Sequence, residues 1–439
     1  MSYAETTNER LFFAEAWRAV REAERCLGCY DAPCAAACPT RINVPRFIGR
    51  LRTGNLAGAY ETLVSANALP AICGLVCPTE YLCEGACVVS KLSGRPVQIG
   101  ALQYFVCHAA QTGETAAAER AERVAVIGGG PAGIAAAVSL RRLGYGVSLY
   151  DRNPRLGGLV SYAIPSYRLP DSAIERELGR LADAGIALHL GATLGEAELA
   201  DIFASHAATF LAVGLSLSGA LQIPGLGLSG VWPALEYLAA ARRAARGEGQ
   251  PPALGRHVIV IGGGNVAVDA ASVAARQGAA QVTVLYRRTQ AEMPAWAEEY
   301  KDAAALGVQF RWLTAVTEII GAGGRVSGVR LQRMELTQPD ASGRRGVRPA
   351  AGDEEILPCD TVIVAIGQML ECDALQRLGL EVTPEGFLRV DAATWETTRR
   401  NVFAGGDAVR GGSYVVQAVA DGAQAALAIH RRLAGEVQP

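Results

Sequence analysis

Apolar residues recur along the chain with two periods, which divide it into a helical N-terminal region and a larger α/β region. Residues 1–25 predict a polar start followed by an amphipathic helix. Between Val44 and Ala68, apolar side chains stand at helical spacing, as Phe47, Ile48, Leu51, Leu56, Tyr60, Leu63 and Val64. We therefore expect residues 1–110 to form a small, mainly helical, loop-rich domain. Residues 111–122 are small and polar, which is typical of a linker.

Strand patterns begin after this linker. A β-branched apolar run at 124–127 leads through glycines into a helical pattern at 134–143 and a second strand at 147–150. The same order returns from position 258, with its second strand at 282–286. Further expected elements are strands at 210–214, 361–367 and 401–404, a helix at 415–430 and an exposed loop at 241–256. Strands alternating with helices indicate parallel sheets, so we expect two βαβ nucleotide-binding units, one inserted in the other.

The first strand–helix junction has the spacing G-x-G-x-x-G, at Gly128, Gly130 and Gly133. Glycines there permit a tight turn and a close approach of the backbone to a pyrophosphate at the helix N-terminus. Asp151 ends the second strand, 18 residues after Gly133, where a carboxylate can accept hydrogen bonds from a ribose. A purely structural glycine turn is the alternative, but strand, helix and acid together favour a dinucleotide site.

The second junction has Gly262 and Gly264, with Ala267 in the place of the third glycine. Its second strand ends in Arg287 and Arg288 and not in an acid. A carboxylate would repel a ribose 2′-phosphate, whereas a guanidinium can bind one in bidentate fashion. The first unit therefore suits an adenosine with a free 2′-OH and the second suits NADP(H), unless the arginines are only a solvated pair at a strand end.

The charge balance argues against two classes of partner. The chain has 41 basic and 43 acidic residues, a formal net charge of −2, which gives no footprint for nucleic acid or an anionic membrane surface. Its longest apolar runs are broken by glycine triplets, which fits strands running into helices better than membrane spans. Clustered cysteines without an export signal indicate the reducing cytoplasm.

Eight of the eleven cysteines lie between positions 26 and 87. They are Cys26, Cys29, Cys34 and Cys38, in the pattern C-x2-C-x4-C-x3-C-P, and then Cys73, Cys77, Cys83 and Cys87. Thiolates at such spacings are ligands of metal ions or iron–sulfur clusters. Two zinc ions are the alternative, but a redox-active cluster is favoured beside two dinucleotide sites. By spacing alone, the eight thiols would form two sets of four.

Two dinucleotide sites beside such a cysteine group define an order of electron transfer. Nicotinamide carries hydride as an electron pair, iron–sulfur clusters carry single electrons, and a flavin converts between them. The order nicotinamide, flavin, cluster is therefore chemically coherent. A flavin disulfide reductase would need a C-x-x-C beside the flavin, and the dinucleotide region has none. A dinucleotide sensor without enzymatic activity is another class, and the clusters argue against it.

Several motifs, together with the two glycine fingerprints, carry a resemblance to one family. They are Asp31-Ala-Pro-Cys34, Cys38-Pro39-Thr40, Cys77-Pro78-Thr79, Leu102-Gln103-x-Phe105 and Ala404-Gly-Gly-Asp407. Nearly end to end, the chain resembles the electron-input half shared by dihydropyrimidine dehydrogenase, the glutamate synthase small subunit and the electron-bifurcating NADP–ferredoxin transhydrogenase. It is most similar to the NAD(P)H- and FAD-binding subunits of bacterial NAD-dependent dihydropyrimidine dehydrogenases.

The resemblance implies two 4Fe–4S clusters with crossed ligation. One would be held by Cys26, Cys29, Cys34 and Cys87, and the other by Cys38, Cys77, Cys83 and Gln103. Spacing alone would choose Cys73 over Gln103, but the Leu-Gln-x-Phe context matches the family. A neutral amide in place of a thiolate leaves one negative charge less on that cluster, which should raise its reduction potential.

The resemblance also implies the nucleotide-binding residues. FAD would bind Gly128, Gly130, Ala132, Gly133, Asp151, Gly158, Leu159, Arg168, Leu194, Gly406 and Asp407. NADPH or NADH would bind Gly262, Gly264, Asn265, Val266, Arg287, Arg288, Ala365 and Gly367. No catalytic side chain is predicted, because hydride transfer needs positioning more than acid–base groups.

The predicted fold class is α/β, with two nested Rossmann-like domains of the glutathione-reductase type preceded by an α-helical iron–sulfur domain. The predicted domains are residues 1–120 with two 4Fe–4S clusters, 121–222 and 368–439 for FAD, and 223–367 for NAD(P).

The predicted function is that of a subunit that oxidises NAD(P)H and passes electrons through FAD and two clusters to a partner. The chain has no room for an FMN barrel, so we expect an FMN- and iron–sulfur-containing catalytic partner that reduces uracil and thymine to 5,6-dihydropyrimidines. The alternatives are the glutamate synthase small subunit and a NADP–ferredoxin transhydrogenase subunit. The spacing Cys77-x5-Cys83 is longer than in glutamate synthase, and Thr40 replaces the valine typical of the transhydrogenase.

Overall fold

The computed structural model describes residues 16–110, 119–181, 184–219, 221–339, 345–352 and 354–435. The chain divides into two compact units. The first contains Met1–Ser161, Ser166–Ser216 and Leu370–Pro439, and the second contains Tyr162–Pro165 and Leu217–Met369. The chain therefore leaves the first unit to build the second and later returns to complete the first.

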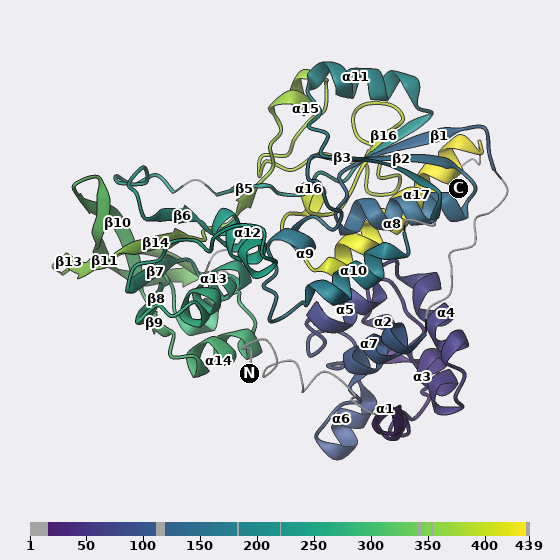
Figure 1. Ribbon diagram of the computed structural model, residues 1–439, viewed down its shortest axis with the longest axis horizontal. Coiled ribbons are helices and arrows are strands. Elements are labelled where there is room, and N and C mark those ends of the chain that lie inside the picture. The colour runs from purple at the N-terminus through teal and green to yellow at the C-terminus, as the bar shows by residue number, and fades with distance from the viewer. Residues whose placement is uncertain are drawn as a thin grey trace. The chain divides into compact units, whose positions relative to one another are not determined.

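Short helices and turns make up the N-terminal part of the first unit (Figure 1). They are α1 (Ala16–Ala23), α2 (Pro33–Ala36), α3 (Val44–Arg52), α4 (Leu56–Ala66), α5 (Pro70–Val76), α6 (Val88–Ser93) and α7 (Ile99–Ala109). The helical stretch expected from Val44 to Ala68 is two helices. Gly54 has a φ of +74° after α3, and Asn55 accepts a hydrogen bond from the Gly58 amide to begin α4. The predictions for residues 1–15 and 111–118 lie outside the described residues.

A five-stranded parallel sheet forms the rest of the first unit, in the order β16-β4-β1-β2-β3. Its strands are β1 (Arg123–Ile127), β2 (Gly146–Asp151), β3 (Ile186–Leu190), β4 (Ala208–Leu211) and β16 (Val402–Ala404). The accompanying helices are α8 (Pro131–Arg142), α9 (Leu159–Tyr162), α10 (Asp171–Gly179), α11 (Glu196–Ser205), α15 (Asp373–Arg377), α16 (Asp407–Arg410) and α17 (Val415–Leu433).

The strands β1, β4 and β16 are buried on both faces, which explains their continuous apolar sequences, whereas the edge strand β3 is largely exposed. On one face, Val126 and Phe210 pack with residues of α8 and α17 such as Leu140 and Ile429. On the other, Ile127 belongs to a cluster that includes residues of α11 and α15. The expected strand–helix–strand order is thus present, and the last strand comes from the far end of the sequence.

The second unit contains another five-stranded parallel sheet, in the order β6-β14-β7-β8-β9. Its elements are β6 (Val231–Pro233), α12 (Ala234–Ala245), β7 (His257–Ile261), α13 (Asn265–Arg276), β8 (Gln281–Leu285), α14 (Ala297–Ala305), β9 (Gln309–Arg311) and β14 (Thr361–Val364). The exposed loop expected at 241–256 is wrong in its first part, because α12 continues through Ala245. Alanine and arginine are strong helix formers, and this run contains both.

An antiparallel sheet that the sequence analysis did not anticipate completes the second unit. Its strands are β10 (Thr314–Ala322), β11 (Arg325–Pro339), β12 (Arg345–Pro349) and β13 (Glu355–Pro358). β11 pairs with each of the other three strands. A short pair, β5 (Leu217–Ser218) with β15 (Gln368–Met369), lies where the chain enters and leaves this unit.

None of the helices in the described ranges is by itself long and apolar enough to cross a membrane. Only α4 and α5 reach that length and composition together, and they are bent by 83° relative to one another.

The packing of α8 against α17 yields a stability prediction. A Cβ added at Gly422 of α17 would lie 2.0 Å from the Ala132 carbonyl oxygen in α8. Gly422→Ala should therefore separate the helices and lower the free energy of unfolding by about 1–3 kcal/mol. Circular dichroism should show a lower melting temperature.

Gly49→Ala in α3 is the matched control, because a Cβ there would meet no atom within 4 Å. It should leave the melting temperature unchanged or raise it, since alanine in a helix is favoured over glycine by about 0.5–1 kcal/mol. Equal melting temperatures for the two variants would contradict the packing described for Gly422.

Candidate functional site

The first candidate nucleotide site lies where β1 ends and α8 begins. Gly128 has a φ of +106°, and a Cβ there would lie 2.3 Å from the Ala212 carbonyl oxygen. A Cβ at Gly133 would lie 1.8 Å from the Gly128 carbonyl oxygen. Gly130 is the N-cap of α8, without a side-chain cap. The first-turn N–H groups of α8 have no partner within the helix, which is the usual arrangement for binding a phosphate.

Asp151 and Gly158 are held against this turn. The Asp151 carboxylate is buried and accepts hydrogen bonds from the amides of Gly129, at 2.6 Å, and Asn153, at 2.7 Å. These two bonds fix the acid beside the glycines, as a ribose-binding role requires. A Cβ at Gly158 would lie 3.0 Å from the Gly130 Cα, so the segment before α9 packs closely on the start of α8.

The C-terminal segment places a second acid, Asp407, next to a residue that lies close to α8. Gly406 is the N-cap of α16, has a φ of +69°, and lies so close to α8 that a Cβ would be 2.9 Å from the Ala132 Cβ. Asp407 follows, and its Oδ1 accepts a hydrogen bond from the Ser413 hydroxyl at 2.8 Å. Burial raises the pKa of Asp407 to about 6. The hydrogen bonds from Ser413 oppose this rise, because they favour the charged form of the carboxylate.

Three remaining residues of the predicted flavin site lie in other surroundings. Leu159 begins α9, and Arg168 is half-buried in the segment between α9 and α10. Leu194 packs against the apolar cluster that contains Ile127 and Leu211. The glycine turn itself therefore gathers Gly128, Gly130, Ala132, Gly133, Asp151, Gly158 and Gly406.

The second candidate nucleotide site lies where β7 ends and α13 begins. Gly262 has a φ of +143°, and a Cβ there would lie 2.2 Å from the Ala365 carbonyl oxygen. The end of β14 therefore lies directly against this turn, with Gly367 following at a φ of +118°. Gly264 is the N-cap of α13, and the Asn265 side chain accepts a hydrogen bond from the Trp296 amide at 3.0 Å. The half-buried Val266 completes the first turn of α13.

The two arginines after β8 are not equivalent. Arg287 is exposed. Arg288 is buried, and its Nε donates a hydrogen bond to the Arg345 carbonyl at 2.9 Å. The sequence analysis treated them as a pair that could bind a 2′-phosphate. In the structure, Arg288 is partly engaged by the backbone, and Arg287 is the guanidinium that is open to a ligand.

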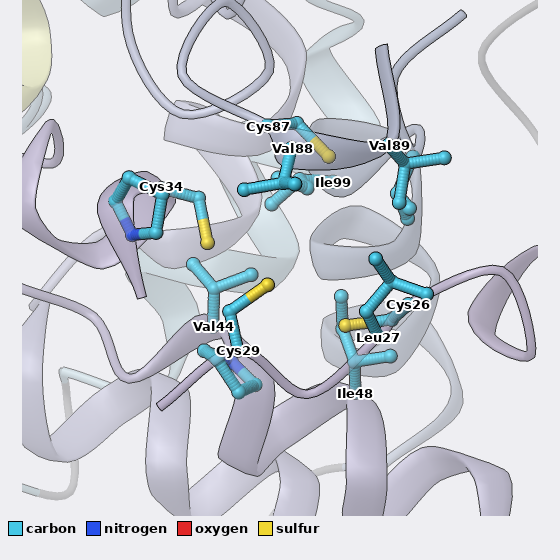
Figure 2. Close-up of a pocket in the computed structure, with 13 residues that line it drawn as sticks. Cys26, Leu27, Cys29, Cys34, Val44, Ile48, Cys87, Val88, Val89 and Ile99 are labelled. Carbon is cyan, nitrogen blue, oxygen red and sulfur yellow. The ribbon is translucent and has the colours of Figure 1, made fainter. Parts of the chain in front are cut away.

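Four thiols from two distant segments converge on one pocket (Figure 2). The cysteines that line it are Cys26, Cys29, Cys34 and Cys87. Its other walls are mostly apolar, and its empty volume is about 350 Å³, part of it open to solvent. The fourth thiol comes from the later segment, and Cys38 is not among the lining residues. These four cysteines are the set expected from crossed ligation. Spacing alone would have grouped Cys38 with the first three.

Burial and mutual repulsion disfavour the charged form of thiols in this pocket, and a bound metal would offset both effects. Burial raises the pKa of Cys34 to about 11, and the charges of Cys26 and Cys87 add to this. Burial likewise raises the pKa of Cys26, with Cys29 and Cys87 adding. Thiolates gathered in this way repel one another, whereas a bound metal deprotonates its thiol ligands outright.

The second thiol group contains Cys38, Cys77 and Cys83, with Cys73 beside them. A hydrogen bond to Cys73, then burial, and then the charges of Cys73, Cys83 and Cys38 raise the pKa of Cys77. Burial, followed by the charges of Glu84 and Cys38, raises the pKa of Cys83. These four sulfurs are therefore electrostatic neighbours.

Gln103 is the remaining predicted ligand of the second group. It is buried in α7, and its Nε2 donates a hydrogen bond to the Pro70 carbonyl at 2.5 Å. That bond assigns the amide orientation and leaves Oε1 as the atom able to bind a metal. α5, which contains Cys73, packs against α7, which contains Gln103.

A structural zinc site places four thiolates about 2.3 Å from one point. Within the part of the chain that the structure describes, no three or more His, Cys, Asp or Glu side chains are arranged to hold one metal ion.

Sequence reasoning missed two acids near these thiols, the half-buried Glu84 and the buried Glu177. Glu84 accepts a hydrogen bond from the Gly100 amide at 3.0 Å, and burial raises its pKa. Glu177 of α10 accepts bonds from two amides at the start of α5. A signal for Glu177 exists, because it shares the buried face of α10 with Ala173 and Ile174. A carboxylate on the apolar face of a helix indicates a buried partner.

Comparisons with known proteins agree with this arrangement. Residues 122–422 match the pyridine nucleotide-disulphide oxidoreductase family, and residues 4–115 match dihydropyrimidine dehydrogenase domain II, 4Fe-4S cluster. The chain is 38% identical to the glutamate synthase [NADPH] small chain of Azospirillum brasilense, over 94% of this chain and 89% of that one. It is 34% identical to the NAD-dependent dihydropyrimidine dehydrogenase subunit PreT of Salmonella typhimurium, over 94% of each.

A solved structure of similar fold is Mycobacterium tuberculosis FprA in complex with NADPH. It is 19% identical, with a TM-score of 0.61 over 73% of this chain and 87% of that one. The predicted fold class is confirmed by this likeness together with the matched families.

The chain belongs to the pyridine nucleotide-disulphide oxidoreductase family and carries a 4Fe–4S domain of the dihydropyrimidine dehydrogenase type in front of it. It is an NAD(P)H-dependent flavin and iron–sulfur oxidoreductase, and the resemblance to the shared electron-input family is confirmed.

The two residues that compete to complete the second group can be distinguished by substitution. Cys73→Ala should retain the iron and acid-labile sulfide of the wild type, because the family context assigns the fourth ligand to Gln103. Gln103→Ala should perturb one cluster only. Iron and sulfide analysis of the purified proteins, with electron paramagnetic resonance (EPR) spectra of the reduced state, measures both. Loss of one cluster's worth of iron in Cys73→Ala would contradict the assignment.

Proposed function

We propose that this chain is the electron-input subunit of a heteromeric enzyme, with FAD, a nicotinamide site and two 4Fe–4S clusters. The observation that carries the proposal is the convergence of Cys26, Cys29, Cys34 and Cys87 on one pocket, in a chain with two dinucleotide-binding folds. When bound, the flavin and the clusters supply the conversion of a hydride into single electrons, chemistry that no side chain provides.

The residues of the first unit would hold FAD. Backbone N–H groups at the start of α8 bind the pyrophosphate, and Asp151 accepts hydrogen bonds from the ribose. Gly158 allows close packing of the backbone beside the cofactor, and Asp407 at the start of α16 faces the same site. In this proposal FAD belongs to residues 121–222 and 368–439. The return of the chain to the first unit at Leu370 supports that division.

The thiols of residues 1–120 would hold two clusters. Cys26, Cys29, Cys34 and Cys87 are the ligands of one. Cys38, Cys77, Cys83 and Gln103 are the ligands of the other. The lining of the pocket in Figure 2 supports the first set, and the free Oε1 of Gln103 supports the second.

Residues 223–367 would bind the nicotinamide nucleotide, with NADPH preferred over NADH. Arg287 supports this preference, because its exposed guanidinium follows the strand end where an adenine ribose binds.

Replacing Arg287 tests the nucleotide preference. Arg287→Ala should remove a charge-assisted hydrogen bond worth about 1.5–3 kcal/mol, or roughly 10- to 100-fold in kcat/KM for NADPH. The value for NADH should change little, since NADH has no 2′-phosphate. Steady-state reduction of ferricyanide by each nucleotide measures the ratio. The control is Arg325→Ala, at an exposed arginine of β11, which should alter neither value. Equal losses for NADPH and NADH in Arg287→Ala would refute the role.

For the electron acceptor, we propose an FMN- and iron–sulfur-containing partner that reduces uracil and thymine. The dihydropyrimidine dehydrogenase description of the N-terminal family and the likeness to PreT support it. The glutamate synthase small chain is the second candidate, because the relative of that name is 38% identical. Likeness to both kinds of subunit supports a heteromer in either case.

Isolation of the native complex tests this proposal. The tagged chain, purified from its own cells, should carry an FMN-containing partner, and the complex should oxidise NADPH when uracil is added. The purified complex is therefore assayed with uracil, and separately with glutamine plus 2-oxoglutarate. Glutamate formation with a large amidotransferase partner would replace the pyrimidine assignment with the glutamate synthase one.

A further inference from the structure

A buried contact joins α10, beside the flavin-binding segment, to α5 of the N-terminal helical domain. The Oε1 of Glu177 accepts a hydrogen bond from the Ala71 amide at 2.9 Å, and its Oε2 accepts one from the Ile72 amide at 2.6 Å. The Glu177 residue is only 4% exposed. Both ends of this contact lie within the first compact unit.

Helix α5 has no cap of its own at these positions. It begins at Pro70, which has no N–H group, and its N-cap residue Leu69 supplies no side-chain hydrogen bond. The next two amides have no partner within the helix. Glu177 accepts hydrogen bonds from both, and a carboxylate is also favoured by the positive end of the helix dipole. The start of α5 is therefore built with a residue that lies about a hundred positions later in the sequence.

Three arginines of the same part of the first unit donate to carbonyls of the helical domain. They are Arg180 to Ala68, Arg142 to Val64 at 2.9 Å, and Arg176 to His108 at 3.2 Å. Val64 and His108 lie in the last turns of α4 and α7, where cations stabilise free carbonyls. The dinucleotide-binding part thus caps α4, α5 and α7 of the helical domain.

Two of these helices, α5 and α7, carry residues of the proposed second ligand set. α5 ends at its C-cap residue, Cys77, and is about 10 Å long from its seven residues. Its first carbonyl, that of Pro70, accepts the hydrogen bond from Gln103 in α7. A displacement of the start of α5 therefore moves both Cys77 and the amide of Gln103.

The charge of Glu177 also reaches α7. Burial raises the pKa of Cys107, and the charge of Glu177 is the next contribution. Cys107 stands four residues after Gln103, on the same face of α7. Burial raises the pKa of Glu177, and the guanidinium of Arg180, 3.7 Å away, together with the two amide N–H groups, opposes this rise and favours the charged form. Inside a protein such a field is screened far less than in water.

We infer that Glu177 is a positioning residue for the second cluster: it fixes α5 and Gln103 and lowers the reduction potential of that cluster by its negative charge. The inference rests on the proposed function, because it takes Cys38, Cys77, Cys83 and Gln103 as the ligands. It makes α10 the structural link between the flavin-binding part and the cluster-binding helices. The first cluster, held by the other cysteine set, should not depend on Glu177.

The test is Glu177→Gln in the FAD- and cluster-loaded protein. The substitution keeps the size, removes the charge and directs an amide NH2 toward one of the two backbone N–H groups. EPR-monitored redox titration should show a higher potential and an altered signal for the second cluster only. A selective loss of that cluster, about half of the iron with FAD retained, would support the inference equally. The rate of FAD reduction by NADPH should not change.

Two further variants complete the design. Glu175→Gln makes the same chemical change on the same helix, but Glu175 is exposed. Its ion pair with Arg155, at 3.9 Å, lies at the surface. This variant should leave both potentials unchanged. Glu177→Asp keeps the charge, so its second-cluster potential should return toward that of the wild type.

Three results would overturn the inference. The first is that Glu177→Gln and Glu175→Gln have the same second-cluster potential and the same EPR signal. The second is that Glu177→Gln shifts the reduction potentials of both clusters equally. The third is that Glu177→Gln loses FAD and both clusters together. The last would indicate a role in overall stability only. The proposed function fails separately, if the wild-type protein itself contains fewer than two clusters by iron and sulfide analysis.

Discussion

The gathering of eight thiols within the helical N-terminal domain, four of them buried and four half-buried, is the constraint on which the rest of the structure depends. Burial and the charges of neighbouring thiols raise the pKa of Cys34 to about 11, and burial also raises the pKa of Cys26 and of Cys83. A domain of short helices gains little from its apolar core alone, so inorganic clusters would contribute to its stability as well as to electron transfer. The proposed ligand sets use thiols from both cysteine segments, and each cluster would therefore join parts of the chain that local structure does not hold together.

Backbone approach is the second constraint, and it acts at the nucleotide sites. At Gly128, Gly133 and Gly262, an added Cβ would lie within 2.3 Å of a carbonyl oxygen. Only glycine allows the strands and helices to meet closely enough for free amides to face a phosphate. The closely packed dinucleotide-binding part also caps three helices of the cluster-binding domain. The helices and loops that surround the predicted FAD site thus also support the helices of the cluster-binding domain.

Much of the fold could be predicted from the sequence, because its signals are local. The glycine fingerprints, apolar strands and acid at Asp151 each follow from spacing and period. The grouping of Cys87 with Cys26 in one pocket could not be derived from spacing, because it depends on how the domain folds; the family resemblance supplied it. Period alone also failed to separate α3 from α4, where Gly54 in a left-handed conformation follows the first helix and Asn55 begins the second.

Other features depend on long-range contacts that no local pattern reveals. The capping of α5 by Glu177 joins residues about a hundred positions apart. Arg288 donates a hydrogen bond to the carbonyl of Arg345, which begins β12 of the antiparallel sheet. The strands of that sheet carry no sequence motif, so this contact could not be foreseen. Two adjacent arginines therefore looked equivalent in the sequence and differ in the structure.

The most direct test of the central claim is an anaerobic reductive titration of the purified chain with dithionite. One FAD takes up two electrons and each 4Fe–4S cluster takes up one. The account predicts uptake of about four electrons per chain, with bleaching of both flavin and cluster absorbance. Uptake of about two electrons, with bleaching of the flavin bands alone, would contradict it.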